Sequence, residues 1–152
     1  MSSYRTVIVG TDGSESSFRA VERAASVSHD AGASLIIACA FRPLRDRDRQ
    51  RAESELGELS YQVSGSHPAE DLLREAEGIA RKVGAESVTA VAVEGDPVDC
   101  LAKLVETKSA DLIVVGNRGL NSIAGRILGS VPANISHRAG CDVLIVHTTG
   151  GR

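Results

Sequence analysis

The sequence predicts an α/β domain with a flavodoxin-like (Rossmann-like), doubly wound, five-stranded parallel sheet, in strand order 3-2-1-4-5 with helices on both faces. Short, continuously apolar runs alternate with helical patterns along the chain, and its 152 residues suit one domain. Since only 3% of the residues are aromatic, the core must be built from Val, Ile, Leu and Ala. We therefore expect a single domain over residues 1–152, with a variable connection at 42–66.

Five short apolar runs are the predicted strands. The first carries Val7, Ile8 and Val9, whose β-branched side chains favour extended backbone. Continuous apolar runs of this kind indicate strands that are buried on both faces of a sheet. The predicted strands cover residues 6–10, 35–41, 88–93, 111–116 and 142–147.

The segments between the early runs carry helical patterns with recognisable ends. Ser14 or Ser16 can cap the first helix, and Gly32 is a natural stop. The second helix begins at Pro68, places apolar residues at i, i+3, i+4 and i+7, and ends at Gly84. Both helices can therefore turn an apolar face to the sheet.

The later helices complete the alternation. Asp96 is a candidate N-cap, Pro97 fits the first turn, and the charge of Asp99 favours the helix dipole. A short helix over 130–138 then precedes the last strand. Buried strands joined by helices run parallel, with the helices packed on both faces of the sheet.

The segment 42–66 is the least regular part of the chain. It carries five arginines mixed with aspartates and followed by glutamates. One interpretation is a basic patch for nucleic acid. The mixed signs favour a solvated connection, whose length suggests a flap or lid. With a formal net charge of −3, the chain has no general reason to bind nucleic acid or an anionic membrane.

Cysteine usage and apolar run length bear on the compartment. Cys39, Cys100 and Cys141 are dispersed and form no CxxC pair, which favours a reducing compartment and small buried thiols. The first residues lack a long apolar signal region, and no apolar run approaches the ~20 residues of a membrane span. We expect a cytoplasmic protein without a membrane partner.

The predicted topology brings two glycine-rich loops together. Strand order reverses between the first and fourth strands, where ligands of such folds bind, and the loops there are 10–14 and 116–130. Gly129 and Ser130 lead into a helix whose first amides can hold an anion, and Arg118 can meet phosphate oxygens. The Asp12 carboxylate can accept hydrogen bonds from ribose hydroxyls or help hold Mg²⁺, and the small side chain of Ala40 leaves space for a flat base. The alternative is that these glycines only form turns.

Two common phosphate motifs are absent. Residues 125–130 read G-x-x-x-G-S without the lysine of a P-loop, which argues against a Walker-type NTPase. The first loop reads Gly-Thr-Asp-Gly and does not match the dinucleotide fingerprint G-x-G-x-x-G. The four histidines, His29, His67, His137 and His147, lie in different segments without metal-ligand spacing.

A third motif is present. Gly116, Gly119, Gly129 and Ser130 match G-x2-G-x9-G-[ST]. Together with segments 7–14, 110–119 and 129–135, this motif resembles the universal stress protein family in its nucleotide-binding branch. The resemblance covers nearly the whole chain apart from 42–66, and it is closest to a short single-domain subgroup that binds cyclic AMP.

The resemblance implies an adenine-nucleotide pocket. Many ATP-binding relatives carry a larger residue such as Pro where this chain has Gly10. The smaller Gly10 leaves room for a compact or cyclic ligand. The pair Asn117-Arg118 also differs from the Ser-His of some ATP binders. The implied ligand is cyclic AMP or ATP, with Mg²⁺ only alongside ATP. The implied contacts are Gly10, Thr11 and Asp12 on ribose and base, Ala40 and Val115 on adenine, and Gly116, Arg118, Gly119, Gly129, Ser130 and Val131 on phosphate.

The family further implies a homodimer through the last strand. Residues 143–146 form an apolar edge without Pro or Lys, which is prone to pair with another chain. The alternative is that His147 and the final Gly-Gly-Arg blunt this edge. The expected function is a stress-response module that senses or sequesters a nucleotide. The alternatives are a slow ATPase or autophosphorylating enzyme, for which we identify no catalytic residue, and an interaction protein without nucleotide.

Overall fold

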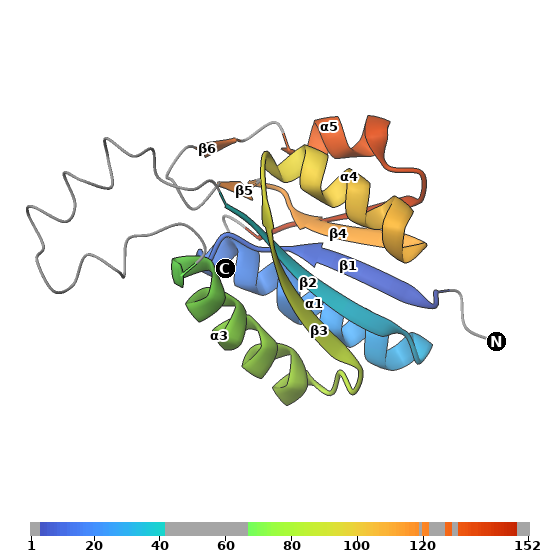
Figure 1. The fold of residues 1–152 in the computed structure, drawn as a ribbon. Coiled ribbons are helices and arrows are strands. Elements are labelled where there is room, and N and C mark those ends of the chain that lie inside the picture. Colours follow the sequence, from blue (N-terminus) through green and yellow to red (C-terminus); the bar gives the residue numbers. More distant parts are fainter. Residues whose placement is uncertain (1–3, 42–66, 119, 122–126, 129–130, 149–152) are drawn as a thin grey trace, which may run out of the picture.

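The central element of the computed structural model is a five-stranded parallel sheet in the order β3-β2-β1-β4-β7 (Figure 1). The structure describes residues 4–41, 67–118, 120–121, 127–128 and 131–148. This order confirms the predicted topology, with β7 as the fifth strand of the sheet. The strands are β1 (Thr6–Gly10), β2 (Ser34–Phe41), β3 (Val88–Glu94), β4 (Leu112–Gly116) and β7 (Asp142–Val146).

Helices cover both faces of this sheet, as predicted. The helices α1 (Glu15–Ala31) and α3 (His67–Val83) pack on one face, and α4 (Pro97–Lys108) and α5 (Val131–Arg138) pack on the other (Figure 1). Helix α3 begins one residue before the predicted start at Pro68. The predicted first residue of the last helix, Ser130, lies outside the described residues.

Local capping rules explain the ends of α1. Of the two candidate caps, Ser14 is the N-cap, because its Oγ accepts the backbone N–H of Ser17 at 3.1 Å. Gly32 ends the helix in the left-handed conformation with φ 68°, and its N–H donates to the carbonyl of His29. A residue with a Cβ is disfavoured at that φ, which is why glycine stops this helix.

The start of α4 also follows the sequence prediction. The Oδ2 atom of Asp96 accepts the backbone N–H groups of Val98 at 3.1 Å and Asp99 at 3.3 Å. Pro97 fills the first turn, where its missing N–H removes no helical hydrogen bond. The helix ends at Ser109, which adopts the left-handed conformation with φ 52° that usually belongs to glycine.

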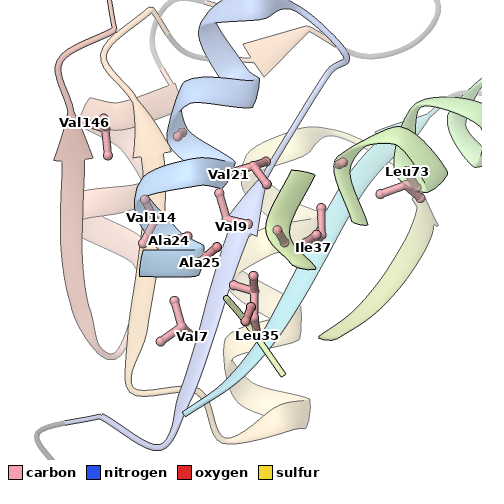
Figure 2. Packing of buried hydrophobic residues seen from close by; sticks show 14 of the residues in the cluster. Val7, Val9, Val21, Ala24, Ala25, Leu35, Ile37, Leu73, Val114 and Val146 are labelled. Carbon is pink, nitrogen blue, oxygen red and sulfur yellow. The ribbon is translucent and has the colours of Figure 1, made fainter. Parts of the chain in front are cut away.

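The larger part of the core lies between the sheet and the helices α1 and α3 (Figure 2). Val9, Leu35 and Ile37 of the strands are fully buried there, against Val21 and the alanines of α1. Full burial of one such side chain stabilises the fold by about 1.5–3 kcal/mol. The opposite face buries Ile8, Ile113 and Val115, so successive strand residues alternate between two aliphatic cores.

The strand β3 departs from the prediction that it is buried on both faces. It lies at one edge of the sheet, its Thr89 is exposed, and its other residues are at most half-buried. The physical reason is its edge position, since β2 is its single partner strand among the described residues. The apolar pattern of α3 likewise overstates burial at its end, where Val83 is 39% exposed.

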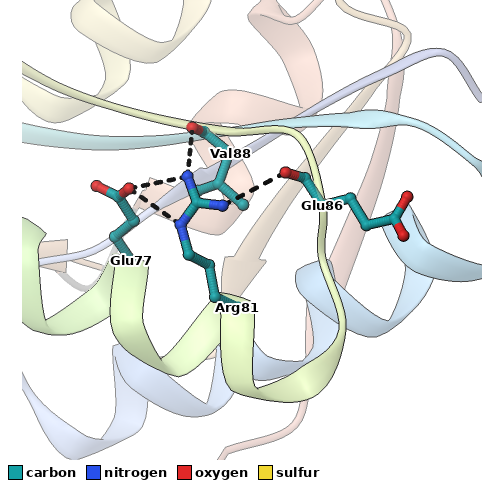
Figure 3. Close-up of polar contacts among 4 residues, drawn as sticks. All are labelled: Glu77, Arg81, Glu86 and Val88. Atoms are coloured by element: carbon teal, nitrogen blue, oxygen red, sulfur yellow. Dashed lines mark hydrogen bonds and ion pairs between the residues drawn. The ribbon is translucent and has the colours of Figure 1, made fainter.

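Arg81 fixes the turn from α3 into β3 (Figure 3). Its guanidinium donates to the Glu77 carboxylate at 3.0 and 3.2 Å, one helical turn earlier. The same group reaches the carbonyls of Glu86 at 3.4 Å and Val88 at 3.5 Å. These contacts hold the first residues of the edge strand against the helix.

The loop predicted over 116–130 contains regular structure that the sequence did not indicate. The strands β5 (Leu120–Asn121) and β6 (Ile127–Leu128) pair antiparallel as a small separate sheet. Two-residue strands carry too few residues for a recognisable alternation of apolar and polar positions.

No helix among the described residues is long and apolar enough to cross a membrane.

Candidate functional site at the carboxyl ends of the central strands

The predicted site residues of the first two strands meet at one edge of the sheet. Gly10 ends β1, and Ala40 is the penultimate residue of the neighbouring β2; both are buried. Beyond the strand, the N–H of Thr11 still donates to the carbonyl of Ala38 at 2.9 Å. Gly116 ends β4 on the other side of β1. The strand order therefore reverses between β1 and β4, as predicted, and places both loops at this edge.

A closed set of hydroxyl contacts shapes the loop after β1. Thr11 is 1% exposed, and its Oγ1 lies 2.7 Å from the Oγ of Ser17. Since the Ser17 hydroxyl donates to the Ser14 carbonyl, the Thr11 hydroxyl is the donor to Ser17. Thr11 Oγ1 in turn accepts the N–H of Gly13 at 3.2 Å. Thr11 therefore acts mainly inside the loop, which it holds in shape.

Asp12 and Gly13 form the middle of this loop. The Asp12 Oδ1 atom accepts the N–H of Ser14 at 3.0 Å, and the residue is half-buried. This contact holds the carboxylate at the start of α1. Gly13 has φ 85°, and a Cβ on it would lie 3.1 Å from a methyl group of Leu72. Glycine is therefore required here both by backbone conformation and by the close approach of α3.

The loop after β4 is described only in its first part. Val115 is 0% exposed and packs with Ile8 and Ile135 in the second core, and Arg118 is exposed. Three of the predicted phosphate residues, Gly119, Gly129 and Ser130, lie outside the described residues. Val131 begins α5, whose start lies at this same edge in Figure 1.

A residue that the sequence patterns did not indicate joins the loop after β4 to the first turns of α1. Thr148, just after β7, is 3% exposed, and its N–H and Oγ1 both donate to Oδ1 of Asn117, at 2.8 and 2.9 Å. Its Oγ1 also contacts Ser16 Oγ, and its carbonyl accepts Arg19 Nη1 at 2.6 Å. No sequence signal marks a lone threonine after a strand, because its partners are more than 30 residues away.

The surroundings of Cys39 on β2 favour a neutral thiol. Burial, with a smaller effect of the Asp12 charge, raises the pKa of Cys39 to about 12. Cys39 is therefore a buried, protonated side chain beside Ala40, as the sequence prediction of small buried thiols requires. Across the part of the chain that the structure describes, no three His, Cys, Asp or Glu side chains gather as a metal site.

A separate hollow lies between α3 and β3. Its volume is about 580 Å³, and its lining includes Phe41, Leu73 and Ala92 with the charged Glu70 and Arg74. None of its described lining residues belongs to the loops after β1 and β4. The described residues Gly10, Thr11, Asp12, Ala40 and Gly116 of the predicted contact set lie elsewhere, at the carboxyl ends of β1, β2 and β4.

Comparison with known proteins gives consistent matches over nearly the whole chain. Residues 3–147 match the family model of the universal stress proteins. The chain is 52% identical over 149 residues to Universal stress protein Rv1636 of Mycobacterium tuberculosis, covering 98% of this chain and 100% of that protein. The crystal structure of protein Rv1636 matches at 46% identity over 98% and 99% of the two chains, with a TM-score of 0.61.

Two further solved structures match. The crystal structure of a universal stress protein in complex with cAMP is 45% identical, over 97% of this chain and 100% of that chain, with a TM-score of 0.74. A universal stress protein from Archaeoglobus fulgidus is 21% identical over 93% of each chain, with a TM-score of 0.66. The second likeness supports the fold alone.

Proposed function

This chain belongs to the universal stress protein family, and from that premise we propose that it binds cyclic AMP as a stress-response module that senses or sequesters the nucleotide. The observation that carries the proposal is the 45% identity, over essentially both chains, to a universal stress protein crystallised with cAMP. The gathering of Gly10, Thr11, Asp12, Ala40 and Gly116 at one edge of the sheet supports the same site.

The proposed contacts divide by ligand group. Gly10, Thr11 and Asp12 face ribose and base, where the absent Cβ of residue 10 leaves room for a compact ligand and the Asp12 carboxylate accepts a hydroxyl. Ala40 lines the adenine, and Val115, which is fully buried in the second core, supports the wall of the pocket from behind. The phosphate is held by Gly116, Arg118, Gly119, Gly129, Ser130 and Val131, through backbone N–H groups and one guanidinium.

Cyclic AMP suits this set of groups better than ATP. Its single phosphate carries one negative charge, which one exposed arginine and a helix start can balance without a metal ion. ATP carries a larger negative charge on three phosphates, which one arginine and one helix start balance less completely, so ATP would bring Mg²⁺ held by its phosphates and Asp12. ATP binding and slow hydrolysis are therefore the competing outcomes of the test.

We also propose that the protein is a homodimer paired through β7. This strand lies at the edge of the sheet opposite β3, and its Ile145 is 46% exposed. An exposed apolar strand edge is a template for pairing with a second copy. Free thiols at Cys39, Cys100 and Cys141 fit the reducing cytoplasm in which we place the protein.

Calorimetric titration tests the proposal. The purified protein is titrated with cyclic AMP, with cyclic GMP as the base control, and with ATP in the presence and absence of Mg²⁺. Tight binding of cyclic AMP, together with weak binding of ATP that does not depend on Mg²⁺, supports the proposal. If ADP accumulates with time, the result favours a slow ATPase. If none of these ligands binds, the result favours an interaction protein without nucleotide.

A further inference from the structure

Thr148 lies just after β7 and contacts both the residue that follows β4 and the start of α1. Its backbone N–H, its carbonyl and its hydroxyl all have partners, and the residue is 3% exposed. The partners come from two different elements: Asn117 directly follows β4, whereas Ser16 and Arg19 lie in the first turns of α1. One buried residue therefore connects the chain after β4 to the start of α1.

The directions of the hydrogen bonds make the Thr148 hydroxyl specific. The Oδ1 atom of Asn117 can only accept, so the single proton of Thr148 Oγ1 goes to it. Ser16 must then donate its own proton to Thr148 Oγ1. The hydroxyl is thus both donor and acceptor, a combination that valine has the shape but not the chemistry to replace.

The methyl group of Thr148 fixes a third point. A Cβ on Gly116 would lie 3.3 Å from Thr148 Cγ2, closer than most real Cβ contacts. The N–H of Asn117 also donates to the Val146 carbonyl at 2.8 Å, which extends the β4–β7 pairing to the residue after the strand. The path of the chain at residues 116 and 117 is therefore set by the segment 146–148.

From these contacts we infer that Thr148 is a positioning residue for the proposed nucleotide site. It holds the start of the loop after β4, which leads to Arg118, at a fixed distance from the α1 turns that follow Asp12. The inference rests on the proposed function, which it deepens. It predicts that nucleotide affinity depends on a side chain that does not itself touch the ligand.

The test compares Thr148→Val, Thr148→Ser and the matched control Thr89→Val, which makes the same change at an exposed position on β3. Cyclic AMP affinity is measured by calorimetry, and unfolding without ligand by circular dichroism. We expect about tenfold weaker binding for Thr148→Val, from the loss of one buried hydrogen-bonding group, recovery to within about threefold for Thr148→Ser, and no change for Thr89→Val.

The outcomes separate this inference from the function beneath it. Wild-type binding with unchanged affinity in Thr148→Val overturns the positioning role and leaves the proposed function standing. No cyclic AMP binding by the wild type overturns both. If Thr148→Val fails to fold, Ser16→Ala, which removes the donor from a half-buried position, must weaken binding by severalfold in a folded protein, and unchanged affinity there overturns the role.

Discussion

The buried hydroxyls of Thr11 and Ser17 lie 2.7 Å apart and join the end of β1 to the first turn of α1. Thr11 follows the last residue of β1, and Ser17 Oγ also accepts the N–H of Asp12 at 3.3 Å. This pair holds Asp12 at the carboxyl edge of the sheet. The shape of the first loop therefore depends on hydroxyl groups rather than on apolar packing.

Removing one member of this pair should destabilise the fold. Ser17→Ala leaves the Thr11 hydroxyl as a buried donor without its acceptor, and we expect a loss of about 1–3 kcal/mol in the free energy of unfolding. Urea denaturation followed by circular dichroism measures it. The control is Ser26→Ala at a half-buried position on the same helix, and a loss equal to that of the control contradicts the role of the pair.

The proposed phosphate contacts predict an effect of bulk at residue 129. Gly129→Val should abolish cyclic AMP binding while leaving the unfolding transition in place, because a branched side chain blocks the approach of phosphate to the backbone N–H groups. Calorimetry measures the affinity. Gly78→Val on α3 is the matched control, since a Cβ there meets nothing within 4 Å. Undiminished affinity in Gly129→Val would refute this placement of the ligand.

The edge strand β7 predicts a change in oligomeric state. Ile145→Lys places a charge on the 46%-exposed apolar position of the proposed dimer edge, and we expect the dimer to dissociate to monomer. Sedimentation velocity across a range of concentrations measures the mass. Val83→Lys, at a 39%-exposed position on α3, should leave the mass unchanged. A monomeric wild type would contradict the proposed dimer, and a dimeric Ile145→Lys variant would show that β7 does not form its interface.

The raised pKa of Cys39 predicts a loss of stability at alkaline pH. Burial raises this pKa from the ordinary thiol value of 9.0 to about 12, so the folded state keeps its proton over a range in which the unfolded state releases it. The stability from this group is complete below pH 9 and falls as the pH rises towards 12, by at most about 1.4 kcal/mol per pH unit. The thiol of Cys39 is the source of that slope.

Urea denaturation between pH 8 and about 11 measures this dependence. Cys39→Ala is less stable at every pH because it leaves a small cavity, but its stability should fall less steeply than that of the wild type. The comparison isolates one group, because the two chains share every other titrating residue. Parallel slopes for the two proteins would show that Cys39 titrates alike in the folded and unfolded states.

Much of the fold could be predicted from the sequence because its signals are local. The N-cap Ser14 and the stop Gly32 follow from the hydrogen bonds that every helix end leaves unmade and from the φ that glycine allows. The order of the strands follows from right-handed crossovers between buried parallel strands. The same rules placed Gly10, Ala40 and Gly116 at one edge of the sheet.

Three features could not be read from local patterns. The exposure of Thr89 on β3 depends on its being at the edge of the sheet, and the small β5–β6 pair is too short to leave a periodic signal. The choice between Ser14 and Ser16 as cap also depends on the fold, because Ser16 is engaged by a residue 132 positions later in the chain.

Local patterns in the sequence were enough to predict the layered α/β architecture, the helix ends and the edge that holds Gly10 and Gly116, since each depends on backbone conformation and the burial of apolar side chains. The link from Asn117 through Thr148 to Ser16, in contrast, has no counterpart in any local pattern. Hydrogen bonds between such distant residues exist only once the register of β4 and β7 and the packing of α1 have brought their atoms within reach.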